Sequence, residues 1–170
     1  MTAAVSSLLL TAICCMTSGC GESVSAEVRE FRRQYLSDQP IAGENSVSKI
    51  REQIKSGEIS AETPFVVRAR INAGEMPPWG TGTASFVITD ATGHDGDKEH
   101  NPHDCPFCSR NIQESIAQVH FQDKNGQLLQ TDSRELFALR ENQLVIVQGT
   151  GRIDDSDTLV ITAQKMFVKN

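Results

Sequence analysis

A short stretch from His94 to Cys108 concentrates the side chains that could bind a metal or exchange electrons. It holds three of the four histidines and two of the five cysteines of the 170-residue chain. Cys105 and Cys108 form a Cys-x-x-Cys pair, whose sulfurs lie on one tight turn and can share a metal ion or form a disulfide. His100 and His103 lie on the same segment and can complete a tetrahedral site. The spacing therefore predicts a metal site, with Zn²⁺ as the ion that accepts two sulfurs and two imidazoles.

Other side chains could add to this site. His94 begins the same stretch, and His120 lies on the polar face of a predicted strand, from which it could reach the metal. Residues 90–104 carry five acidic side chains and one lysine, a balance of −4 that attracts divalent cations. The same acidic residues would also suit a solvated loop without ligands.

The cysteine pair has two alternative interpretations. One is a structural disulfide between Cys105 and Cys108. The other is thiol–disulfide exchange, because Cys-Pro-Phe-Cys resembles the dithiol of glutaredoxin-like proteins, with residues 109–117 as the helix that lowers the thiol pKa. A thioredoxin-type site needs a strand leading directly into the motif and a cis proline after it, whereas all six prolines lie at or before Pro106. Covalent haem attachment is excluded because Ser109, not histidine, follows the pair.

Composition disfavours a nucleic-acid-binding protein. The formal net charge is −6, which disfavours a phosphate backbone, and only nine residues are aromatic. Arg68, Arg70 and Trp79 are the residues of a barrel face that could still bind an oligosaccharide or a nucleic acid. No Ser/His/Asp arrangement, Gly-rich phosphate loop or catalytic carboxylate pair stands out. Enzymatic activity is therefore left open, with binding favoured.

The N-terminus has the pattern of an export signal. Residues 1–19 are uncharged and contain an apolar run, Leu8–Met16, that is too short to span a bilayer. The run ends in Thr17-Ser18-Gly19-Cys20, which resembles the lipobox of bacterial lipoproteins. The resemblance implies lipid attachment at Cys20 and a location at the cell envelope, with membrane and envelope proteins as partners. A buried N-terminal strand or helix and simple secretion are the alternatives. Cys105 and Cys108 would then be the two cysteines left for other chemistry.

The remaining elements read as strands with two helical segments before them. Residues 20–45 form a tether with a short helix over 26–36, and a second helix is expected within 46–60. Apolar residues alternate over 65–71, 84–89 and 116–121, and two long strands cover 143–153 and 158–168. Asn125-Gly126 predicts a hairpin with a return arm over 127–131, and a short helix is expected over 134–139. We expect 64–169 to fold without the residues before it.

This pattern predicts a mainly β fold, a small five- or six-stranded barrel with one short helix before the last two strands. The strands Phe65–Ile71, Ala84–Asp90, Leu144–Ile153 and Leu159–Val168 resemble the OB-fold (oligonucleotide/oligosaccharide-binding) pattern over 64–169, with a His/Cys-rich insertion at 91–110. Taken whole, the chain is similar to uncharacterised bacterial lipoproteins with a single OB-like domain. That resemblance implies a fold and a location, and the activity has to be argued from the site.

Overall fold

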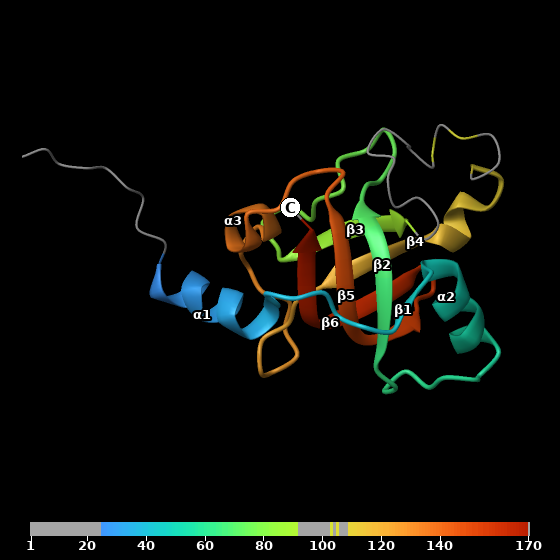
Figure 1. The fold of residues 1–170 in the computed structure, drawn as a ribbon, viewed down its shortest axis with the longest axis horizontal. Helices are drawn as coiled ribbons and strands as arrows, with labels where there is room; N and C mark the ends of the chain where they lie inside the picture. The colour runs from blue at the N-terminus through green and yellow to red at the C-terminus, as the bar shows by residue number, and fades with distance from the viewer. Residues whose placement is uncertain (1–24, 92–102, 104, 106–108, 170) are drawn as a thin grey trace, which may run out of the picture.

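Five strands with alternating buried residues close into a barrel (Figure 1). The computed structural model describes residues 25–91, 103, 105 and 109–169. Inward-facing apolar side chains are buried on every strand, because successive residues of a strand point to opposite faces. The barrel strands are β2 (Phe65–Ile71), β3 (Ser85–Asp90), β4 (Ile116–His120), β5 (Leu144–Ile153) and β6 (Leu159–Lys169).

The pairing order identifies the barrel as OB-like. The strands follow one another as β2-β3-β4-β6-β5, and β5 pairs back with β2 to close the ring. All these pairs are antiparallel except β4 with β6, which is parallel. The first barrel strand thus pairs with the second and fourth, and a short helix, α3 (Ser133–Phe137), lies between the third and fourth. The predicted mainly β, OB-like fold is confirmed.

A two-residue strand that the sequence pattern did not indicate lies beside the barrel. β1 (Glu44–Asn45) runs parallel to β2 and pairs with Val66 and Val67. β3 pairs with β2 only from Ala69 onward, so β1 covers the first half of that strand edge.

Helices lie on two sides of the barrel (Figure 1). α1 (Ala26–Tyr35) contacts β6 and α3, whereas α2 (Val47–Lys55) contacts the 3₁₀ segment η1 (Ser109–Ser115) and four barrel strands. The N-terminal helical segment is confirmed. Side-chain caps define where the helices begin: Ser25 Oγ accepts from the Val28 N–H, and Ser46 Oγ accepts from the Lys49 N–H.

The hydrophobic core extends beyond residues 64–169. Tyr35, Val47 and Ile50 are at most 5% exposed and belong to the same cluster as the barrel side chains. The Tyr35 ring meets Phe121 and Phe137 edge to face, with centroids 5.1 and 6.2 Å away, and its hydroxyl donates to the Gln122 carbonyl. The expectation of a self-contained 64–169 barrel left out these three buried side chains.

The predicted hairpin at Asn125-Gly126 contains the turn but not a full return strand. Gly126 has φ +77°, and the Asp123 carboxylate accepts from the backbone N–H groups of Asn125 and Gln127. After the turn, one isolated bridge joins Leu128 to Gln122. The Asp123 N–H donates to the Gln127 carbonyl at 2.7 Å and the Leu129 N–H to the Phe121 carbonyl at 3.0 Å, so residues 127–129 form a short return arm before the chain continues into α3.

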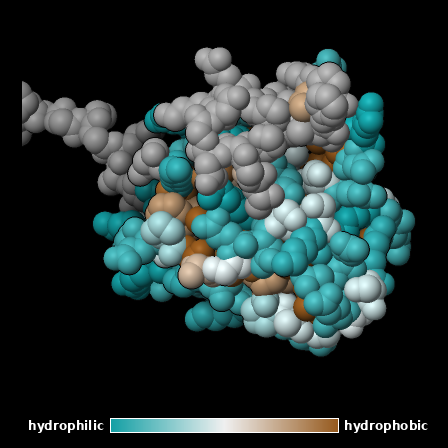
Figure 2. Space-filling model, turned by 45° about the vertical axis from the view of Figure 1, so that its right-hand side comes forward, coloured by the Kyte–Doolittle hydropathy of each residue, from teal (hydrophilic) through white to brown (hydrophobic). Residues whose placement is uncertain are grey.

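The described surface is largely polar. On the face seen in Figure 2, hydrophobic atoms show only in small areas between hydrophilic ones. Met76, 70% exposed, is the large hydrophobic residue that stands out among the described residues. Over the same part of the chain, no helix combines the length and apolar character needed to cross a membrane.

Candidate functional site at the base of the insertion

The predicted ligand His103 lies against the end of β3, where the insertion leaves the barrel. Its Nε2 is 3.2 Å from Thr89 Oγ1, and that hydroxyl donates its own hydrogen to the Asn72 carbonyl at 2.9 Å. A hydroxyl has one hydrogen, so Thr89 Oγ1 must accept from His103, and Nε2 carries the proton. In a neutral ring this tautomer places the lone pair on Nδ1.

Gly74 supports the face of the same ring. A Cβ built at position 74 would lie 2.8 Å from Nδ1, 3.1 Å from Cγ and 3.2 Å from Cε1 of His103. The similar distances to Cγ and Cε1, only slightly longer than that to Nδ1, place this point above the ring rather than in its plane. Gly74 also has φ +71°, so glycine is favoured here both by the backbone and by the ring. Because the Nδ1 lone pair lies in the ring plane, it does not point at Gly74.

Asn72 connects the two groups that hold His103. This buried residue accepts the Thr89 hydroxyl on its carbonyl and the Gly74 N–H on its side-chain oxygen, at 2.9 and 2.7 Å. Its amide nitrogen donates to Asn142 Oδ1 at 2.8 Å. The site is therefore positioned by the rigid end of the barrel and not only by the insertion itself.

The other predicted ligands of the insertion are partly outside the described residues. Cys105 is half-buried, and its carbonyl accepts from the Ser109 N–H at 2.9 Å, which connects it to the start of η1. Cys108, His100 and His94 lie outside the described residues, as does the lipidation candidate Cys20. Among residues 25–91, 103, 105 and 109–169, no three His, Cys, Asp or Glu side chains gather as a metal site.

His120 lies away from His103. It pairs across the sheet with Ser85 on β3 and Thr162 on β6, four residues along β3 from Thr89, or about 13 Å of strand. Burial lowers the pKa of His120 below its ordinary value, and the nearby Arg152 charge lowers it further. His103 and Cys105 lie in the insertion, whereas His120 lies at the other end of the β3–β4 pair.

The three residues of the predicted barrel face all make intramolecular contacts. Arg68 Nη1 donates to Glu44 of β1 at 3.2 Å, and Arg70, only 9% exposed, donates to the Asn142 carbonyl at 3.0 Å. Trp79 packs edge-on against Phe86, with centroids 6.2 Å apart, and the Arg134 guanidinium lies 5.6 Å from the centre of its ring. They form no continuous exposed surface of the kind that stacks bases.

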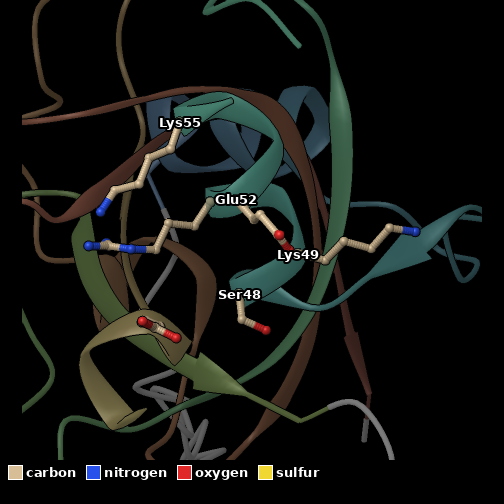
Figure 3. A pocket seen from close by; sticks show the side chains of 6 residues that line it. Ser48, Lys49, Glu52 and Lys55 are labelled. Atoms are coloured by element: carbon tan, nitrogen blue, oxygen red, sulfur yellow. The ribbon is translucent and has the colours of Figure 1, made fainter. Parts of the chain in front are cut away.

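A pocket that the sequence did not indicate lies between α2 and η1, near the same base of the insertion (Figure 3). It has a volume of about 450 Å³. In Figure 3 the side chains of Lys49 and Lys55 extend in different directions from α2, with Ser48 and Glu52 between them. Ser48 Oγ is 3.4 Å from a carboxylate oxygen of Asp90, the last residue of β3 before the insertion. The lining residues are Ser48, Lys49, Arg51, Glu52, Lys55 and Glu114.

Arg51 is the unusual member of this pocket because its side chain is only 5% exposed. Its Nη2 donates to Asp157 Oδ2 at 2.6 Å, and Lys55 Nζ lies 2.7 Å from the other oxygen of that carboxylate. The hydrogen bond from Lys55 and the charge of Arg51 hold the pKa of the Asp157 carboxyl below its ordinary value. Arg51 Nη1 is buried, and no group in the described part of the chain accepts a hydrogen bond from it.

Comparison with solved structures gives distant likenesses of the fold. No family model matches the chain, and no curated protein matches it. A crystal structure attributed to an aspartyl-tRNA synthetase from Leishmania major Friedlin aligns with a TM-score of 0.43 and 8% identity. The alignment covers 84% of this chain and 25% of the other, so this chain spans a quarter of that protein's length. The OB-like assignment accordingly rests on the strand order of the barrel itself.

Proposed function

We propose that this protein is a metal-binding OB-like module, exported and lipid-anchored through Cys20 at the cell envelope. Zn²⁺ is the proposed metal, with Cys105, Cys108, His103 and His100 as its ligands and His94 as an alternative fourth. The supporting observation is the fixed His103 ring. Donation from a ring N–H to a second group, here the Thr89 hydroxyl, is the usual way a ligating histidine is oriented in proteins.

The donor types fit this ion. Two thiolates and two imidazoles are a common tetrahedral set for structural zinc, and such a set leaves no open position for a reacting water. The proposed role is therefore binding rather than catalysis. Thiolates and neutral imidazoles are required, so acid should release the metal as these ligands are protonated.

Metal content separates this proposal from a disulfide. Elemental analysis of protein purified without added metal should find zinc close to one per chain. Cys105→Ser should abolish this stoichiometry, and His103→Ala should weaken binding strongly. The matched control is His120→Ala, which removes an imidazole from the distant end of the β3–β4 pair and should leave the metal content unchanged.

Thr89→Val tests the orientation of His103 directly. It keeps the shape of the side chain and removes the acceptor for Nε2–H, which should weaken zinc affinity roughly 10- to 100-fold. A metal-free protein whose mass is two hydrogens below its reduced mass, and which keeps its fold in chelator, would contradict the proposal. That result would assign Cys105 and Cys108 to a disulfide.

The lipid anchor needs its own measurement. Mass spectrometry of protein extracted from membranes should show an N-terminal Cys20 carrying two or three acyl chains. Protein with an intact Met1, recovered without membranes, would contradict the export proposal and leave the metal proposal untouched.

A further inference from the structure

We infer that the anchored protein is oriented with α1 against the membrane surface, so that the side carrying α2, η1 and His103 faces away from it. The partner of the α1 surface is the layer of lipid headgroups. This inference rests on the proposed lipid attachment at Cys20. The observation that carries it is the short length of chain between Cys20 and the folded body, which begins at Ser25, the N-cap of α1.

α1 is a fixed part of the folded body. Phe31 packs against the hydrophobic core, and Tyr35, at the end of the helix, is buried within it. Arg32 donates to two carbonyls at the end of α3, at 2.6 and 3.1 Å. The helix therefore moves together with the barrel, and only the residues before Ser25 set the distance between the barrel and the lipid.

The link before α1 is too short for the opposite orientation. Residues 21–24 separate Cys20 from Ser25, and at about 3.3–3.6 Å per residue the chain between these two residues spans at most roughly 18 Å. Two or three acyl chains would hold Cys20 stably at the membrane surface. A domain of this size is about 35 Å across. With α1 pointing away from the membrane, the start of the helix would be about that far above the headgroups, which is twice the reach of the link.

The exposed side chains of α1 suit lipid headgroups rather than the hydrocarbon interior. Glu27, Arg29 and Glu30 are exposed and charged near the start of the helix, while its large apolar side chains pack on the barrel. A helix that lies in the membrane interface would instead bury an apolar face among the lipid chains. The contact of α1 with the membrane is therefore polar, and the acyl chains supply the binding free energy.

This orientation presents the candidate metal site to the aqueous compartment. Figure 1 shows α1 and α2 on opposite sides of the barrel, where α1 contacts α3 and β6 and α2 contacts η1. His103 lies against Thr89, which directly precedes Asp90, and the Asp90 carboxylate contacts Ser48 of α2. The site is consequently accessible to soluble metal ions and to partner proteins in that compartment.

Relaxation enhancement by a paramagnetic lipid tests the orientation. The full acylated chain is extracted from membranes and reconstituted into phosphatidylcholine nanodiscs that contain a lipid with a gadolinium-chelating headgroup. The methyl groups of Val28 on α1 and Ile54 on α2 are the matched pair, because both side chains are partly buried against the core. The enhancement falls with the sixth power of distance, so it should be more than roughly tenfold larger at Val28 than at Ile54 in a body about 35 Å across.

A spacer variant tests whether the short link sets this ratio. Ten Gly and Ser residues inserted between Val24 and Ser25 extend the reach to roughly 50 Å, so the ratio of the two enhancements should fall toward one. The same insertion between Ala61 and Glu62, in the exposed turn before β2, is the matched control and should leave the ratio unchanged.

The outcomes separate this inference from the lipid anchor itself. Acylated protein with equal enhancements at Val28 and Ile54, or with the larger one at Ile54, would overturn the orientation and leave the anchor in place. A ratio that the spacer before Ser25 does not lower would contradict the role of the short link. A mass spectrum without acyl chains on Cys20 would refute the inference together with the export proposal.

Discussion

The two sides of the barrel that are covered by helices differ in the side chains that pack there. On the α1–α3 side, aromatic rings fill the space: Tyr35, Phe121 and Phe137 lie within 4.5–6.2 Å of one another. The polar groups there have partners, because Arg32 donates to two carbonyls at the end of α3 at 2.6 and 3.1 Å. On the α2–η1 side, the aliphatic side chains of Val47 and Ile50 fill the core, and the buried Arg51 beside them has one nitrogen with no acceptor among the described residues.

This difference separates two ways of holding a helix to the barrel. On the α1–α3 side, rings pack against one another and Arg32 donates to backbone carbonyls. On the α2–η1 side, Arg51 donates to an Asp157 carboxylate that also pairs with Lys55, and one of its nitrogens has no acceptor among the described residues. The His103 position lies near this second side, since Thr89 precedes Asp90, which contacts Ser48 of α2.

The largest expected loss of stability comes from a substitution among the aromatic rings of the α1–α3 side. Phe121→Ala removes a fully buried ring that contacts three other aromatic residues, so the free energy of unfolding should fall by about 3–5 kcal/mol. Chemical denaturation followed by circular dichroism measures the change. Met76→Ala, at a 70% exposed side chain, is the control and should change it by less than about 0.5 kcal/mol. Similar effects from both substitutions would mean that the rings do not hold this side together.

A smaller loss of stability is expected from a substitution at Gly74, where the barrel meets the insertion. Gly74→Ala places a methyl group 2.8 Å from His103 Nδ1 at a residue with φ +71°, and should cost about 1–3 kcal/mol of unfolding free energy. Gly126→Ala is the matched control, since φ there is +77° and nothing lies within 4 Å of the new Cβ. The difference between the two variants isolates the His103 contact. Equal costs would show that the ring does not rest on Gly74.

The smallest expected change in stability comes from the ion pairs of Asp157 with Arg51 and Lys55. The pKa of Asp157 is lowered in the folded protein, first by the Lys55 hydrogen bond, so the ionised carboxylate stabilises the fold. This contribution is complete above the ordinary carboxyl pKa and is lost as the pH falls through the lowered folded value. Asp157→Asn should therefore reduce stability at neutral pH, and its difference from wild type should shrink in acid. A difference that stays constant with pH would rule out the charge as its source.

Sequence reasoning predicted the barrel because β2, β3 and β4 carry a period-two pattern and β5 and β6 are long runs rich in β-branched residues. The range 65–71 for the first barrel strand is the range found for β2. β1 escaped detection since two residues, Glu44 and Asn45, cannot show a period and are held by pairing with β2. The return arm is shorter than the predicted 127–131: it pairs back over 127–129, and the chain then continues into α3.

The site was only partly predictable. The motif identified His103 and Cys105 as chemistry-bearing residues, but the groups that orient His103 come from other segments, at Asn72, Gly74 and Thr89. Arg51 could not be found from the sequence. Charged residues are rarely buried, and its burial depends on Asp157, 106 positions later in the chain. Sequence periodicity describes a helix face, whereas a pocket arises where two distant segments meet.

Closure of the barrel by β2 and β5 also sets the order of events in folding. The closing pair joins Phe65 to Gly149, more than 80 positions apart, while the β5–β6 hairpin joins neighbours along the chain. Loop-closure entropy makes the distant pairing slow relative to hairpin formation. The hairpin should therefore form early, and the ring should close in the rate-limiting step, on the millisecond-to-second scale typical of β-barrels with many non-local contacts. Until that step is complete, the edges of β2 and β5 can pair with other chains, so the unclosed barrel is the folding species most prone to aggregate.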